Sequence, residues 1–184
     1  LHVSASVGVV TDEQTSPLNT DSVLRDADLA MYAAKGQGRG RIESFEPAMH
    51  DRVQRRLSTE VALRQALIEQ DLVLAFQPVV SITDGTIIAN EALVRWMRDG
   101  TVVMPEEFIP LAEDLGLIVD IGAWVLRSAA QRLPDLRRGH PDARLTVNIS
   151  ARELRHPGMA RLAEEILMTE NVAPDAIVLE VTET

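Results

Sequence analysis

The sequence predicts an α/β fold in which strands and helices alternate and the strands line up in a parallel sheet. Two observations support this class. Short apolar runs of strand length occur at 72–80, 87–96, 144–150 and 176–183, and amphipathic helical segments separate the last three of them. Strand, helix, strand, helix, strand with links of this length is typical of β/α units. A strand-helix piece and a charged linking helix precede these units.

Composition narrows the class of protein further. The 184 residues carry 18 basic and 28 acidic side chains, a formal charge of −10, and 46% of them are hydrophobic. This profile fits a globular domain and argues against binding a nucleic acid polymer through a basic surface field. The chain has no cysteine, which excludes a disulfide framework and suits the cytoplasm. No apolar run reaches the length of a membrane span, although a longer parent protein could be anchored through an upstream region.

The first 46 residues predict a strand, a helix and a second strand. The apolar run 2–10 reads as a strand cut from a larger unit, residues 19–22 offer helix caps, and 42–45 form one more short strand. We expect the helix to end with Lys35 at the negative, C-terminal end of the helix dipole and with Gly36 in the left-handed conformation. The glycine-rich stretch after it closes a helix, so it does not match a dinucleotide loop, which opens one. The cations Lys35 and Arg39 fit a solvated helix end.

A charged helix is predicted from 48 to 69, with an apolar stripe along one side. We interpret residues 47–69 as a linker helix between two domains, with the boundary near residue 50. The domain organisation expected is then 1–46, the linker 47–69, and a second domain over 70–184.

The most informative stretch is 89–96, where charged side chains interrupt an apolar strand. Strand alternation places Glu91, Leu93 and Arg95 on one face. Charges on such a face must be paired, hydrogen-bonded or metal-bound, and a buried Glu91–Arg95 ion pair is the structural alternative. The preceding run 72–80 reads as a strand covered on both faces, able to form a hairpin with 87–96. Its one polar side chain, Gln77, could be a buried amide that makes its hydrogen bonds to backbone groups.

Polar side chains close the later strands. Helices are predicted at 105–115, ended by Gly116, and at 120–138, shortened or kinked by Pro134; the strand 144–150 and helical segments at 151–154 and 159–170 follow. Asn148 and Glu180 lie at the carboxyl ends of strands, where active sites of β/α barrels form. The structural alternatives are that Asn148 caps the next turn and that Glu180 is an acid on the surface. With Glu91 they form an oxygen-only donor set, which selects Mg²⁺, Mn²⁺ or Ca²⁺ over zinc.

Four motifs in order carry a family resemblance. Residues 51–184 resemble the N-terminal two-thirds of an EAL domain, the bacterial cyclic-di-GMP phosphodiesterase family, through the segments 76–78, 91–96, 147–150 and 179–183. The first 45 residues resemble the end of a GGDEF diguanylate cyclase domain through 6–9 and 28–39. The chain therefore resembles an internal fragment of a tandem GGDEF-EAL protein.

The resemblance implies a fold, a reaction and a set of roles. The fold is an incomplete TIM-like barrel preceded by the end of an α+β domain. The reaction is hydrolysis of cyclic-di-GMP to linear pGpG with two Mg²⁺ or Mn²⁺ ions, in a parent protein that forms a homodimer. The roles implied are metal ligation by Glu91, Asn148 and Glu180, substrate contact by Gln77, Leu93 and Arg95, support of a loop by Glu183, and nucleotide-phosphate contact by Lys35 and Arg39.

The family pattern also includes an Asp-Asp pair, a lysine, a glutamate and a glutamine that would lie beyond Thr184. We therefore expect residues 1–184 alone to lack appreciable phosphodiesterase activity and to fold poorly, because the last strand leaves an unpaired edge. A catalytically silent EAL domain acting as a cyclic-di-GMP receptor is the alternative function. A dimerisation or scaffold piece is a third reading, supported by the linker helix alone.

Overall fold

The computed structural model describes residues 4–11, 19–36 and 38–182. The chain divides into two compact units, residues 1–58 and 59–184, and each is described by itself. Among the described residues, no helix is both long and apolar enough to cross a lipid bilayer.

The first unit packs one helix against a two-stranded parallel sheet. Strands β1 (Val7–Val9) and β2 (Ile42–Ser44) pair in parallel, and helix α1 (Thr20–Gly36) covers them. A side chain at Gly8 would collide with the backbone of α1 at Ala27 and Met31, so only glycine allows this close approach. The core of the unit is small and is built around Ala30, Phe45 and Met49.

The end of α1 differs from the prediction. Gly36 remains within the helix and has no positive φ; the left-handed conformations instead follow it, at Gly38, Arg39 and Gly40. The backbone N–H of Arg39 donates to the carbonyl of Ala34 at 3.1 Å, which satisfies one of the last helical carbonyls. The left-handed conformation expected at Gly36 is thus found a few residues later. Helix α2 (Ala48–Glu69) occupies the range in which the sequence predicts a helix.

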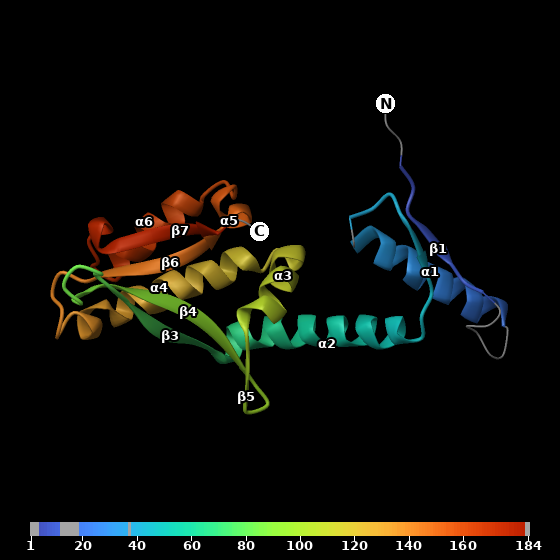
Figure 1. Cartoon of the computed structure of the whole chain (residues 1–184), viewed down its shortest axis with the longest axis horizontal. Coiled ribbons are helices and arrows are strands. Elements are labelled where there is room, and N and C mark those ends of the chain that lie inside the picture. Colours follow the sequence, from blue (N-terminus) through green and yellow to red (C-terminus); the bar gives the residue numbers. More distant parts are fainter. Residues whose placement is uncertain (1–3, 12–18, 37, 183–184) are drawn as a thin grey trace. The chain divides into compact units, whose positions relative to one another are not determined.

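In the described part of the chain, the second unit contains the end of α2 from Thr59 onward, followed by five strands and four further α-helices. In order they are β3 (Leu72–Val80), β4 (Ile87–Arg98), β5 (Thr101–Val103), α3 (Pro105–Leu115), α4 (Ile118–Leu136), β6 (Arg144–Ser150), α5 (Ala151–Leu154), α6 (Met159–Thr169), the 3₁₀ helix η1 (Pro174–Ala176) and β7 (Ile177–Thr182) (Figure 1). The short strand β5 was not predicted. It pairs antiparallel with the end of β4 after the turn at Asp99 and Gly100, both of which have positive φ.

The sheet is mixed rather than wholly parallel. Its strand order is β3-β4-β6-β7, with β5 paired to β4. The predicted hairpin is confirmed, because β3 and β4 run antiparallel in a register that joins Leu72 to Trp96 and Gln77 to Glu91. The β/α part is parallel as expected, from β4 to β6 and from β6 to β7.

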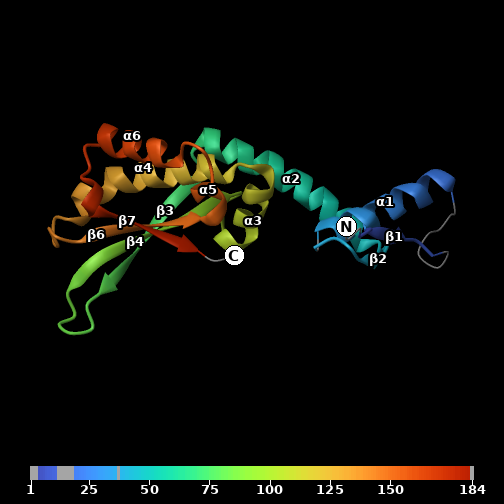
Figure 2. The ribbon, with the colours of Figure 1, turned by 90° about the horizontal axis from the view of Figure 1, so that it is seen from above.

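Helices cover one face of this sheet. Figure 2 shows α4 and α6 lying together along the same side of the strands, with the end of α2 beside α4. The side chains beneath them form the main core, which joins Trp96 and Ala92 of β4 and Val147 of β6 to Phe108 of α3 and Ile121 of α4. Gly116, with φ of 73°, ends α3 as predicted. Pro134 lies in the last turn of α4, which stops at Leu136.

The opposite face of the sheet is open among the described residues. Strand β3 was expected to be covered on both faces, and this is wrong: only Leu72 of the strand is buried, whereas Val73, Val79 and Val80 are exposed. One reason is position, because β3 is an edge strand of the described sheet and has a neighbouring strand only on the β4 side. Strand alternation therefore separates an apolar, helix-covered face from an open face.

Candidate functional site

The open face carries oxygen donors on three neighbouring strands. Glu91 lies on β4, Asn148 on β6 and Glu180 on β7. Asn148 and Glu180 are direct partners in the β6–β7 register, so their side chains share one face. Glu91 is paired with Thr146, two residues before Asn148 on that same face. The β/α topology thus places three side chains from distant positions in the sequence on one face of neighbouring strands.

Glu91 and Asn148 are in contact. The amide nitrogen Nδ2 of Asn148 donates a hydrogen bond of 2.8 Å to Oε1 of Glu91, and both side chains are half-buried. The alternative of a Glu91–Arg95 ion pair is wrong for this structure. The Nη1 group of Arg95 instead donates to the carbonyl of Val94 at 2.8 Å. The carboxylate is therefore held by an amide from the next strand, and the guanidinium does not neutralise it.

Gln77 lies directly opposite Glu91 in the antiparallel pairing of β3 and β4. Its side chain is exposed, so the alternative of a buried amide satisfied by backbone is wrong. Leu93 and Arg95 follow Glu91 on the same face of β4 and are both half-buried. Gln77, Glu91, Leu93 and Arg95 together form a strip along one edge of the open face, and it is polar except at Leu93.

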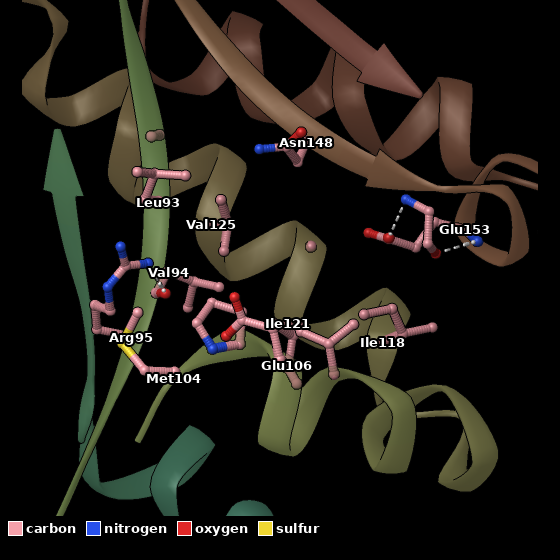
Figure 3. A pocket seen from close by; sticks show the side chains of 15 residues that line it. Leu93, Val94, Arg95, Met104, Glu106, Ile118, Ile121, Val125, Asn148 and Glu153 are labelled. Atoms are coloured by element: carbon pink, nitrogen blue, oxygen red, sulfur yellow. Dashed lines mark hydrogen bonds between the residues drawn. The ribbon is translucent and has the colours of Figure 1, made fainter. Parts of the chain in front are cut away.

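A cavity of about 310 Å³ adjoins this strip. The recorded pairs of β4 and β6 run from Ala89–Arg144 to Ala92–Val147, and the cavity opens beyond the last of them. Figure 3 shows Leu93 and Arg95 of β4 on one side of it and Asn148 of β6 on the other, with residues of α4 forming the apolar wall. Glu106, at the start of α3, also lines the cavity. The cavity can therefore hold a group that has both apolar and charged parts.

The end of β6 is fixed by a capping box that our sequence reasoning missed. Ser150 caps α5: the backbone N–H of Glu153 donates to its Oγ at 3.2 Å, and its own N–H donates to Oε2 of Glu153 at 2.8 Å. The pattern Ser-x-x-Glu before an apolar position is a known signature of this motif, so the signal was present at 150–153. Glu153 is only 3% exposed, and burial raises the pKa of its carboxyl group.

This raised pKa predicts how stability depends on pH. The folded state binds the proton of Glu153 more tightly than the unfolded state does. The free energy of unfolding therefore falls as pH rises from the ordinary glutamate pKa through the higher pKa of the folded state. Glu153→Gln removes the titration and keeps an oxygen acceptor. We expect the difference in free energy of unfolding between the variant and wild type to move in favour of the variant as pH rises, and to favour it least at acidic pH. Urea denaturation across pH 4–8 measures this, and a pH-independent difference would contradict it.

The remaining predicted site residues lie elsewhere. Lys35 and Arg39 belong to the first unit, and both side chains are exposed. They meet the expectation of a solvated helix end, and their contact with a nucleotide phosphate stays a prediction. Glu183 falls outside the described residues.

The donor set has a definite chemistry. Among the described residues, no three histidine, cysteine, aspartate or glutamate side chains are close enough together to hold a metal ion. The set of Glu91, Asn148 and Glu180 contains two carboxylates and one amide, all of which offer oxygen. Oxygen donors suit hard cations such as Mg²⁺ and Mn²⁺. The residues present therefore fit one side of such a site, which needs further oxygen ligands to be complete.

Comparison with known proteins agrees with the motifs on β4, β6 and β7. The family model of the EAL domain matches residues 60–184. The chain belongs to the EAL domain family. The match begins within α2 and includes every strand of the second unit.

Curated relatives match the whole chain, including the first unit. The bifunctional diguanylate cyclase/cyclic di-GMP phosphodiesterase MucR of Pseudomonas aeruginosa is 39% identical over 189 residues, which cover 100% of this chain and 27% of MucR. The cyclic di-GMP phosphodiesterase PdeR of Escherichia coli is 35% identical over 185 residues, covering 100% of this chain and 28% of PdeR. The chain therefore spans about a quarter of the length of these relatives.

Solved EAL structures have a similar fold. A complex of the MucR phosphodiesterase with c-di-GMP has a TM-score of 0.65 and 40% identity, and the match covers 69% of this chain and 52% of that one. The FimX EAL domain of Xanthomonas citri, solved in complex with c-di-GMP, has a TM-score of 0.60 and 26% identity over 75% of this chain and 53% of that one. The α/β architecture of the second unit is thus that of EAL domains.

Proposed function

We propose that this chain is part of a cyclic-di-GMP phosphodiesterase that hydrolyses its substrate to linear pGpG. The observation that carries the proposal is the convergence of Glu91, Asn148 and Glu180 on one open sheet face, beside a cavity that Arg95 lines. The 39% and 35% identity to relatives named as phosphodiesterases supports it.

We assign the roles of the site residues from their chemistry and position. Glu91, Asn148 and Glu180 hold metal through oxygen atoms. Arg95 supplies positive charge for a phosphate in an otherwise acidic chain, since guanidinium groups bind phosphate through paired hydrogen bonds. Leu93 contacts the substrate from the cavity side, and Gln77, which lies across from Glu91, offers amide hydrogen bonds from the edge strand.

The cofactor we propose is Mg²⁺ or Mn²⁺ in a two-metal site. Held by Glu91, Asn148 and Glu180 together with further ligands, such ions would supply Lewis-acid chemistry at the scissile phosphate and would lower the pKa of a bound water. The chain's own contribution is to arrange the oxygens beforehand. The strand registers fix Glu91, Asn148 and Glu180 on a common face, and the Asn148–Glu91 hydrogen bond orients the carboxylate. Further residues beyond this donor set, including Glu183 as support for a loop, would complete the site.

We further propose a tandem arrangement in a longer protein. Residues 1–46 would be the end of a GGDEF domain, 47–69 a linker helix, and 70–184 the first part of an incomplete TIM-like barrel. Alignment of the whole chain with a bifunctional cyclase and phosphodiesterase supports this. Lys35 and Arg39 would then lie near nucleotide phosphates in the cyclase part. A homodimer and a cytoplasmic location complete the proposal, the latter supported by the lack of cysteine.

The test is hydrolysis of cyclic-di-GMP by the complete protein that carries this chain. We expect pGpG to form with Mg²⁺ or Mn²⁺ and turnover to stop when EDTA is added, as measured by chromatography of the nucleotides. Binding of cyclic-di-GMP without turnover under any metal would contradict the phosphodiesterase and favour the receptor alternative. Sedimentation of the same sample measures the proposed dimer.

A further inference from the structure

A buried carboxylate supports the donor set without belonging to it. Glu153, on the short helix α5, is only 3% exposed, and its Oε2 accepts the backbone N–H of Ser150. The return hydrogen bond from the N–H of Glu153 to the Ser150 hydroxyl closes the pair. Ser150 is the last residue of β6 and lies two positions after Asn148, so both side chains belong to the same face of that strand. The carboxylate thus holds the strand end from which Asn148 projects.

Helix α4 leaves space for this carboxylate at one residue. A Cβ atom at Gly122 would overlap with Oε1 of Glu153, whereas the glycine admits it. Gly122 is in the interior of α4, where glycine is less favourable than alanine by about 1 kcal/mol. It has an ordinary backbone conformation there, since it is not among the positive-φ residues. Packing against Glu153 is therefore the physical reason for glycine at this position.

We propose that Glu153 is a positioning residue: seated against Gly122, it fixes the end of β6 so that the Asn148 amide meets the Glu91 carboxylate. The inference rests on the proposed function, because Asn148 and Glu91 are metal ligands there. Three elements meet at this carboxylate, namely β6 through Ser150, α5 through Glu153 itself, and α4 through Gly122. Glu153 lines the same cavity as Asn148 but makes its described hydrogen bonds to Ser150 (Figure 3).

Metal affinity of the complete protein tests this role, with Mn²⁺ as the probe in calorimetric titration. Glu153→Ala removes the acceptor for the Ser150 N–H, and we expect Mn²⁺ affinity to fall by about 10–100-fold, as is usual when a group that orients a ligand is lost. Glu153→Gln keeps an oxygen acceptor, so we expect it to retain affinity within about threefold of wild type. Equal loss in both variants, or no loss in Glu153→Ala, would overturn the proposal.

The Gly122→Ala substitution gives a second, independent test of the positioning role of Glu153. In the wild-type background the new methyl group displaces the carboxylate, so Mn²⁺ affinity should fall as in Glu153→Ala. In the Glu153→Ala background the methyl group has room, and Gly122→Ala should then add little further loss. Leu133→Ala, in the core of α4 at 5% exposure, is the matched control for general destabilisation and should leave Mn²⁺ affinity unchanged. Additive losses, or a Leu133→Ala loss of equal size, would show a purely structural role and reject the proposal.

A metal-free measurement separates this inference from the proposed function. The side-chain amide resonance of Asn148, observed by nuclear magnetic resonance without metal, should shift in Glu153→Ala and stay in place in Glu153→Gln. If this holds while wild type fails to bind Mn²⁺, the positioning role stands and the phosphodiesterase proposal fails. If wild type binds Mn²⁺ and the Asn148 resonance keeps the same chemical shift in both variants, the positioning role fails instead.

Discussion

Replacing Glu91 with alanine in the complete protein is expected to lower kcat for cyclic-di-GMP hydrolysis by about a thousandfold. Loss of one preorganised electrostatic group commonly costs 10²–10³ in rate, and about 4 kcal/mol of transition-state stabilisation corresponds to the upper end of that range. In the described part of the chain, the Asn148 amide donates its hydrogen bond to Glu91. Its removal therefore takes away a proposed metal ligand and also releases Asn148.

The Glu91 experiment is a steady-state assay with pGpG as the measured product. Glu91→Gln is the closer substitution, because it keeps size and polarity but loses the negative charge, and it should be nearly as inactive. Glu164→Ala is the matched control, since Glu164 is an exposed acid on α6 that makes no described contact with the site. Wild-type rates in both Glu91 variants would exclude Glu91 as a metal ligand.

Replacing Trp96 with alanine is expected to give the largest loss of stability, about 3–5 kcal/mol. The side chain is 1% exposed in the main core. It meets Phe108 edge-to-face with ring centroids 5.8 Å apart, and Arg98 lies over its ring at 5.3 Å. A loss of this size is a large part of the 5–15 kcal/mol that stabilises a typical domain. Since Trp96 follows Arg95 on β4, loosening the core face would also disturb the site on the other face.

Urea denaturation followed by far-ultraviolet circular dichroism measures this effect. Trp96→Phe keeps much of the buried aromatic volume and should cost clearly less than alanine. Val102→Ala, on the neighbouring strand β5 at 47% exposure, is the surface control and should change stability by less than about 0.5 kcal/mol. A Trp96→Ala loss no larger than that of Val102→Ala would show that this core does not stabilise the domain.

Local patterns predicted most elements of the second unit. Hydrophobic periodicity and end signals placed α3 and its stop at Gly116, the strand over Arg144–Ser150, and the hairpin that pairs Leu72 with Trp96. The expected parallel sheet was correct for β4, β6 and β7, whose links contain helices long enough to cross the sheet. These features depend on residues that are close together in the chain, and local sequence patterns therefore predict them.

Exposure was predicted less well, because an apolar run does not say where its strand lies in the sheet. The run 72–80 has the composition of a central strand, yet β3 is an edge strand of the described sheet with several valines exposed. Likewise, the sequence left open whether Glu91 pairs with Arg95 or with another group. Only the register of β4 with β6 brings Asn148 within hydrogen-bond distance of Glu91.

The sequence by itself determined the order of the main helices and strands, though not the short strand β5, together with the acidic and cysteine-free composition and the oxygen-bearing side chains near strand ends. The tertiary structure alone decided that Glu91 is bonded by Asn148, that a cavity opens where β4 and β6 part, and that Gly122 admits the buried carboxylate of Glu153. The physical reason is range: periodicity and caps act over a few residues, whereas these contacts join residues thirty to sixty positions apart through the packing of whole elements.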